Sequence, residues 1–391
     1  MTRYGMHQYS YYSSGGYARG GRTWPVVTPY GTYLFSNEHS GRIIWNKTTD
    51  NGLTWERGIV HAGSAGAAVH VWYDGWSGLG TGLIHLGYID STVDDLFYRN
   101  LDPSTDTLST EITVFNGASA TTGGDVTISV SRGGVIYMLG TMDLILETWA
   151  KRSDDGGATF TDITNPVEAA YDQYQLVPGF AADDDDMMLI YFDTTDTEIS
   201  RMNYDQSADS WDETSIFTSW IEDRLTNGGP HHQIALDLAN SKIYLIAWNQ
   251  EDVANQDLLC WEIDDTTITA KTNLITNAVD DMALAALTFD TTTEFLYAFF
   301  VGAEDGSETY KAITGVNINM KVSEDQGTTW GPLIAVTEAR LDFRNLASSP
   351  MTDNFWKDFP LAVMETINNN QCNYKFFKRN FVPKPQFQLG I

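Results

Sequence analysis

The stretch Ser153-Asp154-Asp155-Gly156-Gly157-Ala158-Thr159-Phe160 decides the fold, because its frame returns twice elsewhere in the chain. The other copies are Thr48-Thr49-Asp50-Asn51-Gly52-Leu53-Thr54-Trp55 and Ser323-Glu324-Asp325-Gln326-Gly327-Thr328-Thr329-Trp330. All three read Ser/Thr-x-Asp-x-Gly-x-Thr followed by an aromatic residue. The Asp carboxylate can accept hydrogen bonds from backbone N–H groups of a turn, and the Gly can take a positive φ. Three copies therefore predict three equivalent turns in a repeated unit.

Weaker versions of this turn occur between the three strong copies, at the positions that a regular repeat would give them. Taking residues 48, 102, 153, 205, 264 and 323 as equivalent gives a spacing of 51 to 59 residues. Short apolar or alternating runs fill the intervals, and helical periodicity is nearly absent. A repeat of this length is one four-stranded blade, and 391 residues hold about seven of them. The sequence predicts an all-β chain that forms a single β-propeller of seven four-stranded blades, with six as the alternative.

The last repeat is incomplete, so we expect the N-terminal segment to supply the missing strand and close the ring. The predicted organisation is a propeller over residues 1–382 and an extended tail over residues 383–391. Residues 1–21 form a Tyr/Ser/Gly-rich arm that contributes to ring closure. Docking of both termini on a partner is the alternative to ring closure or frayed ends.

The composition excludes several classes of function. The chain has 52 acidic and 23 basic residues and a formal net charge of −29, which disfavours binding to nucleic acid or to an anionic membrane. No apolar run reaches the roughly 18 residues of a membrane span, and no apolar signal core follows Met1. Synthesis in the cytoplasm without export is therefore expected. Cys260 and Cys372 form no disulfide framework and are predicted to be small buried residues.

The three turns resemble the Asp-box, or BNR, repeats of sialidase-like β-propellers. In that family the boxes lie on the face opposite the ligand mouth. The resemblance therefore implies a structural role, and no catalytic role, for the box residues Asp50, Gly52, Trp55, Asp155, Gly157, Phe160, Asp325, Gly327 and Trp330. The aromatic residue is expected to tuck under the sheet.

In such a propeller the mouth is formed by the loops between second and third strands and by the crossings between blades. These predicted segments carry Arg22, Glu38, His39, Arg42, His61, Tyr171, Tyr174, Trp220, Glu222, Arg224, His231, His232, Arg340 and Arg344. Ligand binding is predicted for Arg22, Glu38, His39, Arg42, Trp220, His231, His232 and Arg344.

Two groups of these residues and one acidic run have alternative interpretations. Glu38, His39 and Arg42 could hold a sugar acid or form a solvated turn with one ion pair. The pair His231 and His232 could contact a ligand or supply a structural imidazole that caps the start of a strand. The two side chains point to opposite sides of the strand and lack a third ligand, so no metal site is predicted. The acidic run Asp183–Asp186 is a solvated hairpin tip or a surface calcium site. No other cofactor is expected.

The family's sialidases need an Asp general acid, three arginines and a Tyr nucleophile paired with a Glu. The segment Arg22–Pro29 approximates their opening, and Glu38 falls at the expected acidic turn, but the segment that would deliver the Asp is missing. The favoured function is therefore carbohydrate recognition, with a glycan or polysaccharide as partner. The alternatives are a glycan-cleaving hydrolase or polysaccharide lyase, and a purely structural decoration protein.

A propeller of this kind without a signal segment resembles adhesin and surface-decoration proteins of phage particles. That resemblance implies a location on a virion surface. Other virion proteins would then be partners for the N-terminal arm and the C-terminal tail.

Overall fold

The computed structural model describes residues 25–37, 42–50, 54–63, 66–90, 95–117, 124–142, 147–166, 171–181, 183–193, 198–218, 232–252, 255–275, 282–302, 318–336, 343–352, 361–367 and 371–376. The predicted N-terminal arm, its closing strand and the C-terminal tail lie outside these residues. No helix among the described residues is long and apolar enough to cross a membrane.

The described chain is almost entirely strand, arranged in consecutive antiparallel sheets. Blade 1 comprises β1 (Val26–Thr28), β2 (Gly31–Asn37), β3 (Ile43–Thr48) and β4 (Glu56–His61), and blade 2 comprises β5 (Gly66–Tyr73), β6 (Ile84–Asp90), β7 (Asp95–Asp102), β8 (Thr107–Leu108) and β9 (Ile112–Phe115). Blade 3 comprises β10 (Gly124–Val130), β11 (Ile136–Met142), β12 (Glu147–Ser153) and β13 (Thr161–Asp162), and blade 4 comprises β14 (Tyr171–Pro178), β15 (Met187–Asp193), β16 (Glu198–Asp205) and β17 (Ser210–Phe217).

The remaining sheets complete the series. Blade 5 comprises β18 (His232–Asp237), β19 (Lys242–Asp252), β20 (Asn255–Ile263) and β21 (Ile268–Ala270). Blade 6 comprises β22 (Met282–Asp290), β23 (Phe295–Gly302), β24 (Ile318–Ser323) and β25 (Ile334–Ala335), joined by β27 (Met351–Thr352), which runs parallel to β22. A last sheet contains β26 (Phe343–Ser348), β28 (Leu361–Ile367) and β29 (Gln371–Phe376).

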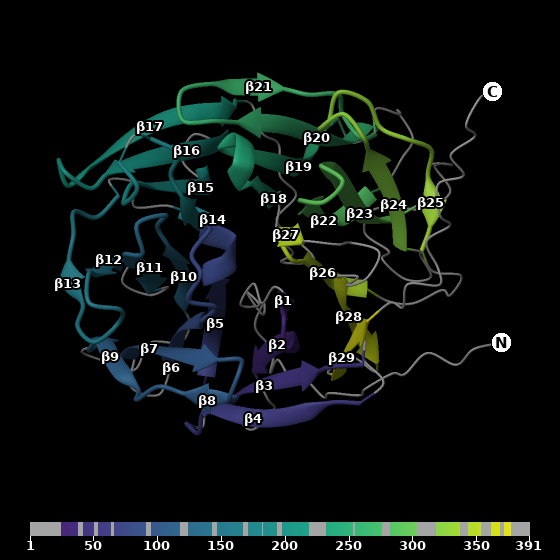
Figure 1. Ribbon diagram of the computed structural model, residues 1–391. Coiled ribbons are helices and arrows are strands. Elements are labelled where there is room, and N and C mark those ends of the chain that lie inside the picture. The colour runs from purple at the N-terminus through teal and green to yellow at the C-terminus, as the bar shows by residue number, and fades with distance from the viewer. Residues whose placement is uncertain are drawn as a thin grey trace.

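These sheets stand around one axis (Figure 1). The first strand of each sheet lies at its inner edge, except in blade 6, where β27 lies beyond β22. The predicted all-β propeller is confirmed. Over the described ranges, six sheets have four or five strands and the last has three, which lies within the predicted range of six to seven blades. Pro350, between β26 and β27, accepts backbone hydrogen bonds from Leu236 and Phe289 and so connects three consecutive sheets.

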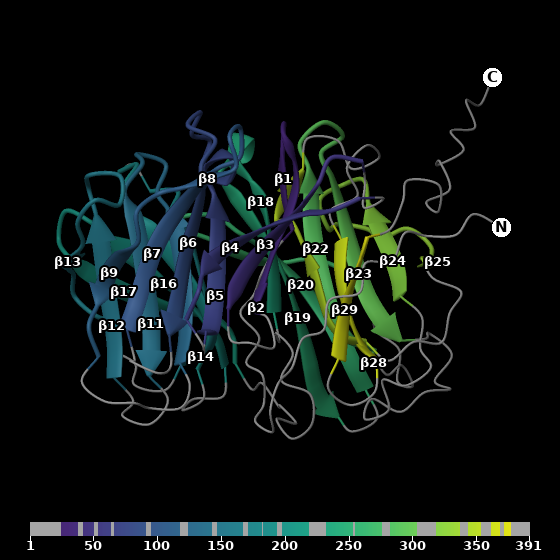
Figure 2. The same ribbon diagram turned by 90° about the horizontal axis from the view of Figure 1, so that it is seen from below.

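The strands run between two ends of the ring, as the side view in Figure 2 shows. The turns joining first to second strands and third to fourth strands lie at one end, which we call the turn end. The opposite end carries the connections between second and third strands and the crossings between blades, and we call it the mouth end.

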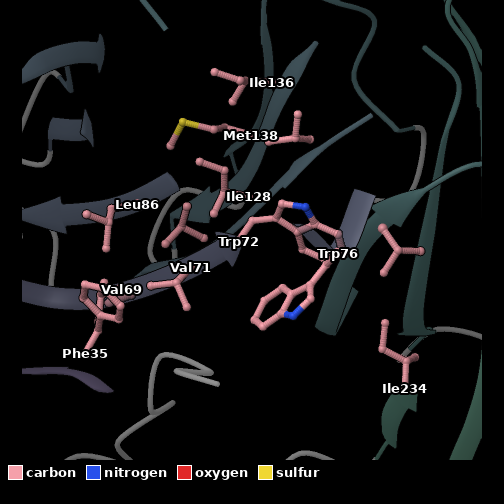
Figure 3. Close-up of a cluster of buried hydrophobic side chains, with 14 of the residues drawn as sticks. Phe35, Val69, Val71, Trp72, Trp76, Leu86, Ile128, Ile136, Met138 and Ile234 are labelled. Carbon is pink, nitrogen blue, oxygen red and sulfur yellow. The ribbon is translucent and has the colours of Figure 1, made fainter. Parts of the chain in front are cut away.

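Two buried tryptophan side chains, Trp72 and Trp76, lie at the turn end of blade 2. A short 3₁₀ helix, η1 (Asp74–Ser77), follows β5, and Trp72 Nε1 donates a hydrogen bond of 2.8 Å to Ser77 Oγ. The Trp72 and Trp76 rings meet edge to face at 5.4 Å. Trp76 is 2% exposed and belongs to the same apolar cluster as Ile234 of blade 5 (Figure 3). One buried cluster therefore includes residues of both blade 2 and blade 5.

The three repeated turns have one geometry. In blade 3, Asp155 Oδ1 accepts hydrogen bonds from Thr159 N at 2.9 Å and Ser153 Oγ at 2.8 Å, and Oδ2 accepts one from Thr159 Oγ1 at 2.7 Å. The equivalent bonds at Asp50 and Asp325 measure 2.7 to 2.9 Å. Hydrogen bonds from Thr159, the side-chain bond foremost, lower the pKa of Asp155 to about 2. These carboxylates are engaged inside their own turns.

The aromatic residue of a turn reaches the preceding blade. Trp330 Nε1 donates a hydrogen bond of 2.9 Å to Thr272 O of blade 5, and Thr272 Oγ1 donates one of 2.6 Å to Thr328 O. In blade 4, where the repeat is weaker, Trp211 Nε1 likewise donates to Thr164 O of blade 3 at 2.8 Å. The repeated turns thus fasten neighbouring blades together.

Candidate functional site

The residues predicted to bind a ligand are placed only in part. Arg22, Glu38, His39, Trp220 and His231 lie outside the described residues. Arg42 is half-buried and directly precedes β3 at the mouth end, and Arg344 belongs to β26. His232 is the first residue of β18 and is 1% exposed. Of the predicted turn residues, Gly52 lies outside the described ranges, and the other eight belong to the repeated turns.

A cluster of titratable side chains lies toward the mouth end of the boundary between blades 1 and 2. His61 is the last residue of β4, and Tyr88 and Asp90 are near the end of β6. Phe97 comes from β7, and Glu111 directly precedes β9. We call these five residues the seam cluster.

Hydrogen bonds and ring stacking hold the seam cluster together. His61 Nδ1 lies 2.8 Å from Glu111 Oε2, and His61 Nε2 lies 3.1 Å from Asp90 Oδ2. The Tyr88 hydroxyl donates a 2.6 Å bond to the same Glu111 oxygen. The imidazole stacks on Phe97 at 5.4 Å and lies 5.3 Å from the Tyr88 ring. One imidazole from blade 1 thus bridges two carboxylates of blade 2.

Local sequence explains how these groups meet. Tyr88 and Asp90 are two positions apart on β6, so both side chains lie on the same face of the sheet. Ile43, the first residue of β3, pairs with His61, which places Arg42 beside this end of β4. Gly63 passes so close that a Cβ there would lie 2.2 Å from His61 Nε2 and 2.5 Å from Asp90 Oδ2. Only a residue without a side chain permits this approach.

The members of the seam cluster differ in the direction of their pKa shifts and in their exposure to solvent. Burial alone would raise the pKa of Glu111, but the hydrogen bonds from Tyr88 and His61 and the charges of His61 and Arg99 outweigh it and hold that pKa below its usual value. Burial, followed by the bond to Glu111, raises the pKa of the Tyr88 phenol. The Glu111 side chain is 32% exposed, whereas those of His61 and Asp90 are 11% and 8% exposed. Glu111 is therefore the member that presents a fixed carboxylate to solvent.

Gly63→Ala is expected to force His61 and Asp90 apart and to lower the free energy of unfolding by about 1 to 3 kcal/mol, the usual cost of overpacking. Gly80→Ala is the matched control, because a Cβ at Gly80 meets nothing within 4 Å. Chemical denaturation of both variants measures the difference. Equal stability of the two would show that the His61–Asp90 contact is not as close as described.

The seam cluster was only partly predictable from sequence. His61 was placed among the mouth residues, whereas Tyr88 and Glu111 were not singled out. A usable signal exists, because Tyr88-Ile89-Asp90 has a counterpart two repeats later in Tyr191-Phe192-Asp193. There the Tyr191 hydroxyl donates to Glu213, an exposed residue on the outer strand β17. A Tyr–Glu pair therefore recurs in blades 2 and 4.

The acidic run on the β14–β15 hairpin is engaged with blade 3. Arg132 Nη1 lies 3.0 Å from Asp184 Oδ1, and Ser131 Oγ donates to Asp185 Oδ1 at 2.8 Å. Across the described ranges, no group of three or more His, Cys, Asp or Glu side chains could hold a metal ion.

No protein-family model and no curated protein matches the chain. Among solved structures, hydrazine synthase from Kuenenia stuttgartiensis has a TM-score of 0.50 at 11% identity, covering 93% of this chain and 99% of that chain. AofleA from Arthrobotrys oligospora has a TM-score of 0.48 at 10% identity, covering 85% and 88%. Trypanosoma rangeli sialidase in complex with the inhibitor DANA has a TM-score of 0.45 at 10% identity, covering 78% and 57%. At these identities a structural likeness concerns the fold and not the function.

Proposed function

We propose that this chain is a carbohydrate-recognition β-propeller that binds a glycan at its mouth end. The observation that carries the proposal is the partly exposed Glu111 carboxylate, held by Tyr88 and His61. A carboxylate fixed in this way can accept hydrogen bonds from sugar hydroxyls without first losing side-chain entropy. The turn-end aspartates are poorer candidates, because their oxygens are already engaged in the repeated turns.

The proposed binding surface extends from the seam cluster along the mouth end. Arg42 belongs to this surface because it directly precedes Ile43, the residue that pairs with His61. The other predicted ligand residues that belong to the proposal are Arg22, Glu38, His39, Trp220, His231, His232 and Arg344.

A glycan-cleaving enzyme is the second candidate, because a tyrosine paired with a glutamate is one part of sialidase chemistry. Tyr88 and Glu111 form such a pair at 2.6 Å. The phenol is fully buried, and its raised pKa keeps the proton on oxygen at neutral pH, which weakens it as a nucleophile. The pair therefore favours an orienting role for Tyr88 over a covalent one.

The test is incubation with a panel of sialylated, uronate-rich and neutral glycans, with retention and reducing-end release measured together. Retention without release is the expected result. If the wild-type protein releases reducing ends and the Tyr88→Phe variant does not, the protein cleaves glycans, and the recognition proposal is replaced by the enzyme proposal. Failure to retain any glycan would contradict the proposal and leave the structural decoration role.

The virion location belongs to the same proposal. Its partners would be other virion proteins, bound through the arm at residues 1–21 and the tail at residues 383–391. Truncation of either segment is then expected to abolish incorporation into particles, measured by immunoblotting of purified virions. Normal incorporation of both truncated chains would contradict this part.

A further inference from the structure

The two nitrogens of His61 each face a carboxylate oxygen, Glu111 Oε2 at 2.8 Å and Asp90 Oδ2 at 3.1 Å. A neutral imidazole has one N–H donor and one lone pair, whereas an ionised carboxylate can only accept. Both contacts can therefore be hydrogen bonds only if the imidazole carries two protons, or if one carboxyl group is protonated.

The position of the extra proton follows from the surroundings of Glu111. Its Oε2 atom already accepts the Tyr88 hydroxyl hydrogen in addition to facing His61. The pKa of Glu111 lies below its usual value, so this group is ionised at neutral pH. With Glu111 ionised, the extra proton belongs to His61 or to Asp90. It is assigned to His61, because a cation between two carboxylates gains from charge as well as from hydrogen bonding at both contacts.

A second buried histidine, His85 on β6 of blade 2, provides a contrast. His85 Nε2 lies 2.6 Å from Asp74 Oδ1, and His85 Nδ1 lies 2.8 Å from the Tyr98 hydroxyl. A tyrosine hydroxyl can donate as well as accept. A neutral imidazole at His85 therefore satisfies both contacts, by donating to Asp74 and accepting from Tyr98. Of these two histidines, His61 is the one whose two contacts require the second proton.

We propose that His61 is a proton-dependent clamp between blades 1 and 2. In its protonated form it joins the end of β4 to Asp90 on β6 and to Glu111 before β9. Loss of the proton leaves a lone pair facing a carboxylate oxygen about 3 Å away, which exchanges attraction for repulsion. The mouth end of the seam then loosens as pH rises.

The other charged and titratable groups at this seam do not replace the clamp. Arg99 Nη1 donates a hydrogen bond of 2.5 Å to Val60 O, and Arg99 Nε donates one of 2.9 Å to Ser109 O. These bonds hold β4 one residue before His61 at any pH below the guanidinium pKa. Tyr88 keeps its proton, and Arg42 directly precedes Ile43, the β3 residue that pairs with His61. The pH-dependent movement is therefore confined to the last residues of β4 and the crossing that follows.

The direct test is ¹⁵N NMR of the imidazole nitrogens in the full chain at neutral pH. His61→Gln and His85→Gln assign the two rings by loss of their signals. We expect both His61 nitrogens to be protonated and His85 to carry a single proton. A His61 ring with one protonated and one bare nitrogen would overturn the proposal.

Amide exchange of β4 measures the mechanical consequence. The pH is raised from about 5 to about 9, across the range in which histidines titrate. After correction for the base catalysis of amide exchange itself, the protection of the β4 amides from exchange should fall about tenfold. Glu111→Gln should abolish this extra loss, because its amide can donate to a neutral imidazole. β17 of blade 4 serves as the internal control strand. An identical pH dependence in wild type and Glu111→Gln would contradict the clamp. Neither measurement involves a glycan, so the proposed function and the clamp can fail separately.

Discussion

Trp76→Ala is expected to lower the free energy of unfolding by about 3 to 5 kcal/mol, the usual cost of truncating a buried tryptophan. The indole is 2% exposed and packs in the cluster that also contains Ile234 from the opposite side of the ring. Its removal leaves a cavity beside the Trp72 and Tyr73 rings, both of which meet the indole edge to face. Urea denaturation followed by circular dichroism measures the loss.

Tyr30→Ala is the control for this prediction, because Tyr30 is 51% exposed in the β1–β2 turn. Its truncation should change the free energy of unfolding by less than about 0.5 kcal/mol. A loss at Trp76 no larger than the loss at Tyr30 would show that the indole does not pack in this buried cluster.

Gly157→Ala should destabilise the protein by about 3 kcal/mol for two independent reasons. Its φ of 93° lies in the left-handed region, which costs any residue with a Cβ about 1 to 2 kcal/mol. A Cβ would also lie 2.1 Å from Cε1 of Tyr98, a buried residue of the preceding blade, and overpacking adds about 1 to 3 kcal/mol. The same denaturation experiment measures this loss.

The neighbouring glycine separates the two contributions. Gly156 has a φ of 71° but nothing within 4 Å of the position a Cβ would take. Gly156→Ala should therefore cost only the conformational part, about 1 kcal/mol. Equal losses at Gly156 and Gly157 would mean that contact between the repeated turn and Tyr98 adds nothing to the joining of blades 2 and 3.

The propeller could be predicted from sequence because the information is local and repeated. The Asp, Gly and Thr of each turn are within five residues of one another, so their hydrogen bonds require no knowledge of the rest of the fold. Repetition at a spacing of 51 to 59 residues then implies strands of a common blade. The contacts of the turn aromatic were not predictable in this way. Trp330 donates to Thr272, which precedes it by 58 residues and belongs to another blade.

The seam cluster shows the same limit at a candidate site. His61 could be assigned to the mouth from its place at a blade crossing. Its partner Glu111 is 50 residues away and precedes β9, an outer strand that pairs with β7 after the two-residue β8. Such an irregular outer strand has no distinct periodicity, because two to four residues are too few to establish one. The pairing of His61 with Glu111 therefore emerges only from the packed blades.

The most direct test of glycan recognition at the mouth end compares two matched glutamates. Each accepts a tyrosine hydroxyl on the outer part of its blade, Glu111 from Tyr88 and Glu213 from Tyr191, but only Glu111 belongs to the seam cluster. Isothermal titration calorimetry should use the glycan of the panel that the protein retains best. Glu111→Ala is predicted to weaken binding at least about tenfold, as expected for loss of a charged hydrogen bond, while Glu213→Ala leaves it unchanged. Unchanged affinity in Glu111→Ala, or an equal loss in both variants, would contradict recognition at the seam.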